Sequence, residues 1–392
     1  MSEIKVNSIK GVGASAAAIT VNNTDGTCTA NVTSIGGGQL SNRNKIINGS
    51  MIVSQRGTSF ASTLSEGQYT MDRFSHSIRG TNDSYYTQVS DSPNGFTKSM
   101  KVTCNSTYTP SGSDNAGFMT SLEGQDLQDF AFGTSSAKSI TISFYAKSGS
   151  QNNGHQYSFQ LRTHPSGGAT NRIVTNSFTV TSSWQKFSFT FAGDTGADIT
   201  DGNTVGIQCC WWLDAGPDDI ISQINSFTSS GSYRSVTGQD HFLNNTSNEF
   251  YITGIQLEVG SVATDFEHRS YADSLDDCLR YAYVINVVDG AYIAAHTAFS
   301  KTSTTVRGNV FLPKPMRAFP SYTGTATDAF FYAQNTGSVF HLDTITSVFN
   351  NSSADRNITN FGIGVTTSSV TAGQGGQIEG QETGTMTFEA EL

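Results

Sequence analysis

The residues that could carry catalysis or hold a metal do not form a recognisable pattern in this sequence. No G-x-S-x-G elbow, P-loop, G-x-G-x-x-G or H-E-x-x-H occurs, and the seven histidines never stand at metal-ligand spacing. Asp194, Asp198 and Asp201 are close in sequence, but their spacing departs from that of an EF-hand loop and favours a solvated turn. We therefore expect no catalytic residue, no metal and no cofactor.

Aromatic side chains are the remaining candidates for function, because the C–H faces of sugars stack on aromatic rings. Trp211 and Trp212 are adjacent in an apparent strand, so they point to opposite faces. If Trp211 belongs to the core, Trp212 faces outward, either as a sugar-binding platform or beneath a neighbouring subunit. Trp184 precedes an alternating apolar run and is predicted to belong to the core.

The C-terminal part of the chain offers a second group of aromatic candidates. Tyr322 follows a proline-containing loop, and Phe330, Phe331 and Tyr332 are consecutive, so alternation would expose at least one ring of the three. Rings in or near loops can contact a ligand without disturbing a sheet. These side chains and Trp212 are the candidates for glycan or receptor binding. The alternative is that the rings fill a small β core.

The composition predicts a β protein. The chain has 392 residues, enough for two or three domains of about 150 residues each. Only 14% of its residues are charged, and it contains 39 glycines. Val, Ile, Phe and Tyr recur between uncharged polar residues, as in short strands joined by turns. The net charge of −10 argues against a nucleic-acid partner. Without a run of about 18 apolar residues, we expect no membrane insertion.

Short alternating segments recur from Asn44 onward. Lys138–Lys147 and Trp184–Phe191 are two of about ten such segments, which together predict a two-sheet sandwich or jelly roll. Ser270–Ile285 predicts a helix instead, with Ser270 as its N-cap. A weaker helical pattern spans Pro217–Phe227. The apolar positions with helical spacing in the first helix are Leu275, Cys278, Leu279 and Ala282.

These segments divide the chain into four parts. Residues 1–40 are rich in small residues and have too little apolar area to fold alone, so they are expected to form an anchoring and assembly arm. A jelly-roll β-sandwich is expected at 41–268, a linking helix at 269–286 and a smaller C-terminal β domain at 287–392. The predicted fold class is therefore all-β with one short helix.

The segment Gly254–Tyr283 resembles a segment of tail-fibre-like structural proteins of tailed bacteriophages. In that family a strand reading G-x-Q-L-E-x-G and the sequence A-T-x-F-E-x-R-S precede a helix that ends in C-x-R-Y. The matching residues here are Gly254, Gln256, Leu257, Glu258, Gly260, Ala263, Thr264, Phe266, Glu267, Arg269, Ser270, Cys278, Arg280 and Tyr281.

Upstream segments resemble earlier strands of the same family, in the same order. They are Asn48–Met51, Gln55–Gly57, Asp72–Phe74, Phe144–Lys147 and Trp184–Lys186. The resemblance covers residues 44–285, and these strands also resemble the jelly rolls of carbohydrate-binding modules. The motif is consistent with an interface between domains, in which Glu258, Glu267 and Arg269 would form a charge network.

The resemblance implies a virion structural protein, usually trimeric, that is associated with host attachment. We accordingly expect a tail-fibre subunit, made in the host cytoplasm and assembled into the virion tail. Its expected partners are further copies in a homotrimer, other tail proteins through the N-terminal arm, and host cell-surface polysaccharide. The C-terminal domain would be the outermost part. The resemblance identifies no catalytic residue.

Two alternatives stay open at this point. One is a head-decoration or tail-knob protein without receptor contact. The other is a virion-associated polysaccharide depolymerase, because the separation of a catalytic carboxylate pair is set by the fold and not by sequence spacing.

Overall fold

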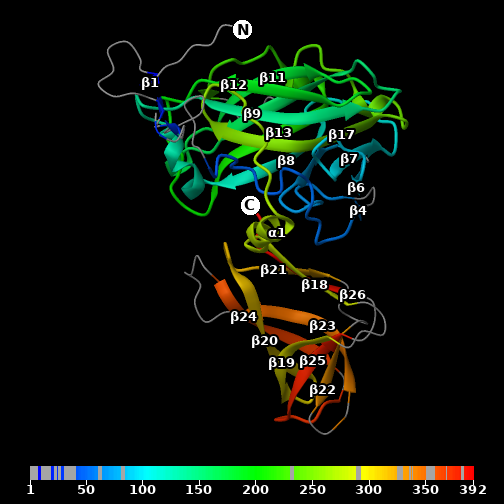
Figure 1. Cartoon of the computed structure of the whole chain (residues 1–392). Helices are drawn as coiled ribbons and strands as arrows, with labels where there is room; N and C mark the ends of the chain where they lie inside the picture. The colour runs from blue at the N-terminus through cyan, green and yellow to red at the C-terminus, as the bar shows by residue number, and fades with distance from the viewer. Residues whose placement is uncertain are drawn as a thin grey trace.

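The computed structural model describes residues 8–9, 19–21, 24, 28–30, 41–60, 64–80, 84–229, 234–287, 293–324, 330–334, 337, 339–349, 358–367, 369–380 and 384–392. The all-β prediction is confirmed, because the elements in this part of the chain are mostly strands. Figure 1 shows a large sandwich and a smaller barrel, with the helix α1 (Tyr271–Leu279) and the C-terminus between them.

The sandwich consists of two antiparallel six-stranded sheets. In spatial order, the first sheet contains β15 (Thr228–Ser229), β11 (Arg172–Thr179), β10 (Gln156–Thr163), β13 (Val205–Ala215), β8 (Asn115–Glu123) and β5 (Ser75–Arg79). The second contains β12 (Gln185–Phe191), β9 (Ile140–Ser148), β17 (Glu249–Val259), β7 (Ser99–Cys104), β6 (Ser84–Val89) and β4 (Ser59–Phe60). Single turns of 3-10 helix occur at Ser166–Gly168, Pro217–Asp219 and Phe242–Asn244, and a longer one spans Gly124–Phe130.

Aromatic rings fill the space between the two sheets. Trp211 of β13 stacks on Phe118 of β8 with ring centroids 5.3 Å apart, and Phe144 of β9 meets Trp211 edge-on at 5.7 Å. Of the two adjacent tryptophans, Trp211 belongs to the core cluster between the sheets, and Trp212 does not. Pairs with this geometry stabilise a core beyond what their buried area alone contributes.

Part of the outer face of the first sheet is covered by the same chain. The parallel pair β14 (Ile220–Ile221) and β16 (Ser235–Val236) lies there, β16 packs on β10, β11 and β13, and Val236 N donates to Ser158 Oγ at 2.8 Å. The predicted weak helix at Pro217–Phe227 is wrong. Only one 3-10 turn forms at Pro217–Asp219, and the β-branched Ile220 and Ile221 then pair as a strand.

The predicted linking helix at 269–286 is shorter than expected. It begins after Ser270, whose hydroxyl oxygen accepts a hydrogen bond from Asp273 N as an N-cap, and it ends at Leu279. The second half of the prediction is wrong, because Ala282–Val287 forms strand β18. This segment carries Val284, Ile285 and Val287, which favour a strand, and β26 (Gly384–Glu389) offers it an antiparallel partner.

The C-terminal region forms a closed barrel, which removes exposed sheet edges. Its strands in order are β19 (Ile293–Thr302), β20 (Thr305–Met316), β24 (Ile358–Thr367), β23 (Val339–Phe349), β22 (Phe330–Gln334) and β25 (Gly375–Gly380). A separate sheet of β18, β26 and β21 (Ser321–Gly324) leads the chain back to the sandwich. The C-terminus therefore lies at the junction and not at the far end of the barrel (Figure 1).

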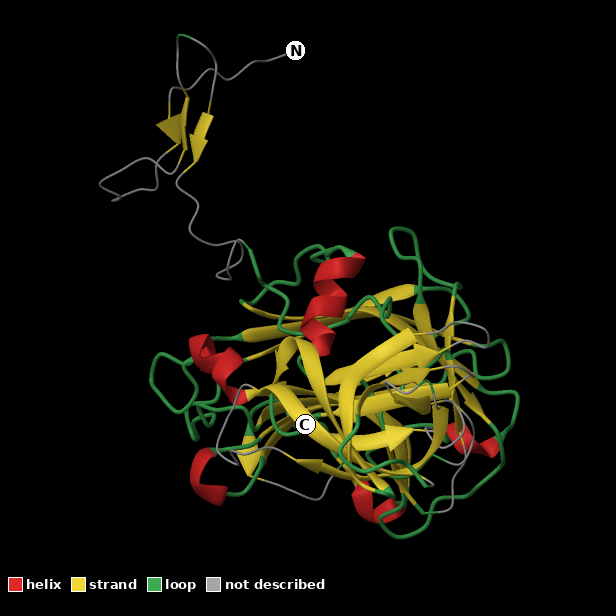
Figure 2. Ribbon diagram, turned by 90° about the horizontal axis from the view of Figure 1, so that it is seen from below, coloured by secondary structure: helices red, strands yellow, loops and turns green. Residues whose placement is uncertain are grey.

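Most of the predicted N-terminal arm lies outside the described residues. Its described parts are the strands β1 (Ser8–Ile9), β2 (Ile19–Val21) and β3 (Cys28–Ala30), which pair as a small antiparallel sheet. Figure 2 shows this sheet standing apart from the sandwich.

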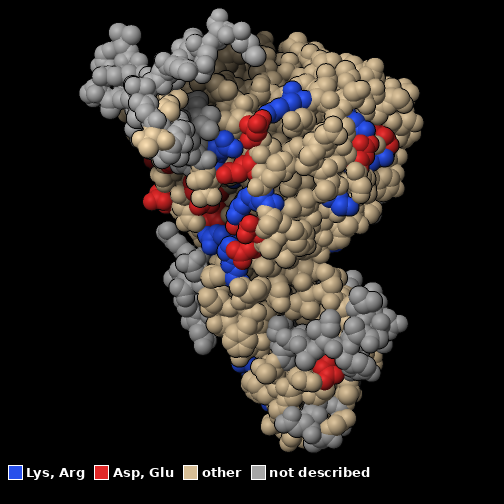
Figure 3. Space-filling view, viewed as in Figure 1, with Lys and Arg blue, Asp and Glu red and all other residues tan. Residues whose placement is uncertain are grey.

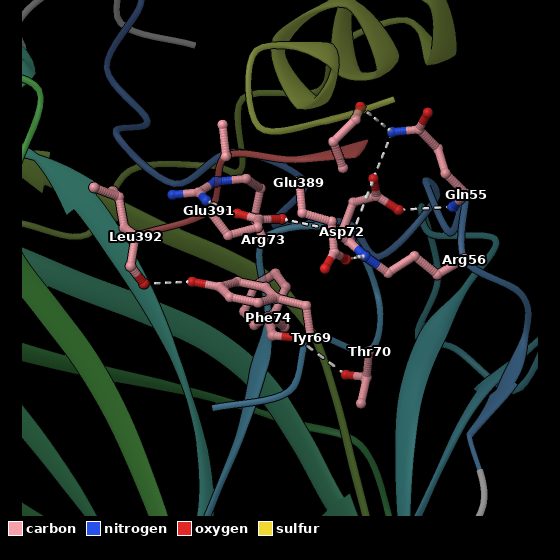
Figure 4. Close-up of polar contacts among 12 residues, drawn as sticks. Gln55, Arg56, Tyr69, Thr70, Asp72, Arg73, Phe74, Glu389, Glu391 and Leu392 are labelled. Carbon is pink, nitrogen blue, oxygen red and sulfur yellow. Dashed lines mark hydrogen bonds and ion pairs between the residues drawn. The ribbon is translucent and has the colours of Figure 1, made fainter. Parts of the chain in front are cut away.

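A buried ionic cluster fastens the returning C-terminal segment to the sandwich (Figure 4). Arg73, only 1% exposed, pairs with Glu391. Arg56 pairs with Glu389 at 2.5 Å and with Glu391 at 3.0 Å. The Tyr69 hydroxyl donates to the main-chain oxygen of Leu392 at 2.7 Å. Burial and the nearby Glu391 carboxylate raise the pKa of Tyr69 to about 12.

The residues that follow α1 hold the other side of this junction. Arg280 forms a bidentate pair with Glu123 at 2.7 and 2.8 Å, and the Tyr281 hydroxyl donates to the same carboxylate at 2.5 Å. The Arg73 guanidinium lies 3.5 Å from the centroid of the Tyr281 ring. These contacts tie Arg280 and Tyr281, at the end of the motif, to Glu123 of β8 in the sandwich. Figure 3 shows acidic and basic side chains gathered at the junction, whereas the visible face of the barrel carries few.

The predicted charge network within the motif is wrong. Glu258 is buried and accepts hydrogen bonds from Thr264, including one from its main-chain nitrogen at 2.9 Å. Glu267 accepts a hydrogen bond from Asn44 N at 2.9 Å, and Arg269 pairs with Asp277 of α1. Each of the three charged side chains therefore bonds a different segment of the chain, because the chain turns between them.

Candidate functional site

None of the predicted barrel rings forms an exposed platform. Phe330 and Tyr332 are fully buried, and Phe331 is 6% exposed, so the prediction that alternation exposes at least one ring is wrong. Phe330 and Tyr332 point into the barrel core. Phe331 points the other way, but His341 of β23 covers it with ring centroids 4.3 Å apart.

Tyr322 and Trp212 are also covered. Tyr322 lies half-buried on β21, beside the junction, and packs on Phe388 with centroids 5.8 Å apart. Trp212 points away from the core as predicted, but it is fully buried by its own chain. The Arg234 guanidinium, next to β16, lies 5.0 Å from the Trp212 ring centroid. The Trp212 ring is therefore accessible neither to a sugar nor to a neighbouring subunit.

Trp184, by contrast, lies on the outer face of the second sheet and is half-buried, so its assignment to the core is wrong. In β12, Phe187 pairs with Phe144 of β9 and shares its core-facing side. Trp184 is three residues earlier, an odd spacing that places it on the opposite face of a strand. This odd spacing in the sequence already indicated that Trp184 and Phe187 face opposite sides of the sheet.

Trp184, just before β12, belongs to a row of side chains that crosses the next three strands, β9, β17 and β7, on this face. Tyr251 of β17 pairs with Lys147 of β9 on one side and with Lys101 of β7 on the other. Lys147 Nζ lies 5.5 Å from the Trp184 ring centroid and 4.6 Å from that of Tyr251. Lys101 Nζ lies 5.5 Å from the Tyr251 centroid. We call Trp184, Lys147, Tyr251 and Lys101 the aromatic–lysine row.

Two carboxylates hold the row in place. Asp91 pairs with Lys147 at 2.5 Å and accepts a hydrogen bond from Trp184 Nε1 at 3.1 Å. Glu249 pairs with Lys101 at 2.5 Å and accepts one from the Tyr251 hydroxyl at 2.8 Å. Each ring is thus oriented by a polar contact at its edge, and a lysine ammonium group lies over its face.

The electrostatics of the row are balanced. Burial opposes ionisation of Asp91, but hydrogen bonds from Lys147 and Trp184 outweigh it and hold the pKa of Asp91 below its usual value. Burial also opposes ionisation of Glu249, but hydrogen bonds from Lys101 and Tyr251 outweigh this effect and lower the pKa of Glu249. Both carboxylates are therefore ionised at neutral pH. A glycosidase acid needs the opposite, a raised pKa, so this pair is unsuited to general acid catalysis.

A second group of rings continues the row along the sheet. Phe96 lies with its ring centroid 5.4 Å from Tyr145 of β9, 5.0 Å from Phe266 and 5.0 Å from His268. Gly254 permits this packing. Its φ is +64°, and a Cβ there would lie 2.7 Å from the Phe96 ring. Aromatic surface thus extends from Trp184 toward the segment that precedes α1.

The described part of the chain contains neither a cluster of metal-ligating side chains nor a membrane-spanning helix. No group of three or more His, Cys, Asp or Glu side chains there could hold a metal ion. No helix among the same residues is long and apolar enough to cross a membrane.

Comparisons with known proteins assign no family. No protein-family model matches the sequence, and no curated protein matches it. Among solved structures, the CBM22-1 xylan-binding domain of Paenibacillus barcinonensis Xyn10C is 12% identical, with 52% of this chain and 94% of that chain covered and a TM-score of 0.27.

Two further structures are similar at the same level. The family 11 carbohydrate-binding module of Clostridium thermocellum, solved with a mixed-linked tetrasaccharide, is 14% identical, with 53% and 98% covered and a TM-score of 0.28. Tailspike protein 4 of bacteriophage CBA120, in its enzymatically active domain, is 13% identical, with 55% and 21% covered and a TM-score of 0.30. Likenesses this distant assign neither a ligand nor a partner to this chain.

Proposed function

We propose that this chain is a non-enzymatic, glycan-binding structural subunit of a phage tail fibre, and that the aromatic–lysine row contacts the glycan. The observation that supports glycan binding is the half-buried Trp184 ring, which lies beside the 9% exposed Tyr251 on one sheet face and has polar groups at its edge. Sugars are recognised by this combination, because the ring face covers C–H groups while nearby donors and acceptors bind the hydroxyls.

The charge balance of the row favours an uncharged polysaccharide. Lys147 is neutralised by Asp91, and Lys101 by Glu249, so the row adds no net charge to a chain that is acidic as a whole. A strongly anionic polymer would be repelled by the net charge of −10, whereas a neutral one would not.

The place of the protein in a virion is supported by the motif resemblance. On that basis we propose a homotrimer whose N-terminal arm, residues 1–40, binds other tail proteins and whose sandwich and barrel face the host-cell polysaccharide. The protein would be made in the host cytoplasm.

Glycan binding is tested by removing the Trp184 ring. Trp184→Ala should weaken binding about tenfold, because a stacked ring contributes about 1–2 kcal/mol. Binding is measured as retardation in native gels that contain mixed-linkage glucan, xylan or galactomannan, with polygalacturonate as the anionic comparison. Trp184→Phe should restore most of the retardation.

The matched control is Tyr271→Ala, which removes a 57% exposed ring on α1, away from the row. Its retardation should equal that of the wild type, and all variants should melt at the same temperature. Equal retardation of Trp184→Ala and wild type would contradict the proposed site. Release of shorter chains from the polysaccharide would contradict a non-enzymatic role.

A further inference from the structure

Two large apolar side chains point out of the barrel wall. Phe299 on β19 is 50% exposed and Phe311 on β20 is 66% exposed, whereas Val306 and Val310 of β20 are buried in the barrel core. Isolated exposed rings are common on proteins, but two on the same wall beside a hollow are a feature of binding surfaces.

The barrel register leaves space on one side of the Phe299 ring, where its neighbour is Gly375, and on the far side of its other neighbour, Arg307. Phe299 pairs with Gly375 of β25 on one side and with Arg307 of β20 on the other, and Arg307 in turn pairs with Gly364 of β24. The glycines have no side chains to fill the surface beside the ring. A hollow of about 300 Å³ opens here, lined by Thr297, Ala298, Phe299, Arg307, Gly308 and Asn309.

Phe311 continues the same surface. It follows Arg307 by four residues in β20, so both side chains point to the same face about 13 Å apart along the strand. Asn309 lies between them and is exposed, and Asn360 of β24 pairs with Phe311 and is exposed too. Polar amides and a guanidinium thus alternate with the two rings.

We propose that this wall of the barrel is a second saccharide-binding site, independent of the aromatic–lysine row. Phe299 stacks on one sugar ring, Arg307 and Asn309 donate hydrogen bonds to its hydroxyls, and Phe311 contacts a later unit of the same chain. The area of the surface favours a sugar chain over a second copy of the protein. Two partly exposed rings supply on the order of 200–300 Å², whereas a stable protein interface takes about 800 Å² per partner.

The test uses the full chain with Phe299→Ala, with Phe311→Ala and with both substitutions. Each of these three variants is made in the wild-type chain and again in the Trp184→Ala chain. Val339→Ala is the matched control, because Val339 is a 48% exposed apolar side chain elsewhere on the barrel. Binding is measured as retardation in the same four polysaccharide gels. Each single substitution should weaken binding about threefold to tenfold, and the loss should persist in the Trp184→Ala background.

Three outcomes would overturn this inference. The first is equal retardation of the double variant and Val339→Ala in every gel, which would leave the sandwich site untouched. The second is a wild type that none of the four polysaccharides retards. The third is a concentration-dependent sedimentation coefficient that the double variant abolishes, which would identify the wall as a contact between copies.

Discussion

His76 shows how a single buried side chain ties the stability of the sandwich to pH. It is 1% exposed, and burial lowers the pKa of its imidazole to about 4. The Tyr86 hydroxyl donates to the main-chain oxygen of Gly117 at 2.9 Å, so its oxygen accepts from His76 Nδ1 at 2.9 Å. The ring is therefore neutral, with its proton on Nδ1.

The free energy of unfolding should fall between pH 6.5 and pH 4 because of this residue. In that range the unfolded chain binds a proton at His76 and the folded chain does not, so acidification favours unfolding by up to about 3 kcal/mol. His76→Gln retains a donor toward Tyr86 but cannot titrate, and should remove this part of the pH dependence.

Tryptophan fluorescence during urea unfolding measures the effect, because Trp184, Trp211 and Trp212 are the chain's three tryptophans and all lie in the sandwich. Comparison of the two proteins at pH 7 and pH 4.5 cancels the contribution of groups common to both. If His76→Gln lost as much stability as the wild type between pH 7 and pH 4.5, His76 would not be the source of this pH dependence.

At the scale of elements, the described strands of the arm pair with one another and not with a strand of the sandwich. The first described hydrogen bonds into the sandwich come from Arg43 and Asn44, and the Asn44 side chain bonds both Ile255 O and Leu257 N of β17. A truncation that ends before Arg43 leaves these described hydrogen bonds into the sandwich intact.

Removal of residues 1–38 should therefore leave the melting temperature of the sandwich unchanged while the protein no longer enters virions. The measurement is a thermal melt followed by immunoblots of gradient-purified virions that carry the truncated chain. Removal of residues 1–44 is the contrast and should lower the melting temperature. An unfolded 1–38 truncation would mean that the arm belongs to a sandwich sheet.

At the scale of the whole molecule, the junction sets how firmly the barrel is held to the sandwich. Glu391→Gln should lower the free energy of unfolding by about 3–5 kcal/mol, because Arg73 is buried and would lose its charged partner. Lys314→Met removes the exposed pair with Asp276 and should cost about 1 kcal/mol or less.

Hydrogen exchange of β26 and thermal melting distinguish these two substitutions. Exchange in β26 should accelerate in Glu391→Gln and stay unchanged in Lys314→Met, because β26 ends beside the buried cluster. Similar effects of the two substitutions would mean that the cluster does not fasten the C-terminal segment.

Features set by neighbouring residues could be predicted from the sequence. Period-two alternation, as at Phe187, Phe189 and Phe191, predicted strands and a two-sheet sandwich, because a strand sorts its side chains by local geometry alone. The cap at Ser270 marked the start of α1 for the same reason. The outward direction of Trp184 was also available from its odd spacing to Phe187, although the apolar run suggested the core.

What covers a side chain, once its direction is known, depends on contacts between distant parts of the chain. Trp212 points outward as alternation requires, yet Arg234 and β16 bury it. The end of the chain returns to Arg56 and Arg73, and Ala282–Val287 is a strand because β26 pairs with it. These contacts join residues far apart in the chain, so no local period encodes them, and burial, ion pairing and the exposed rings follow from packing.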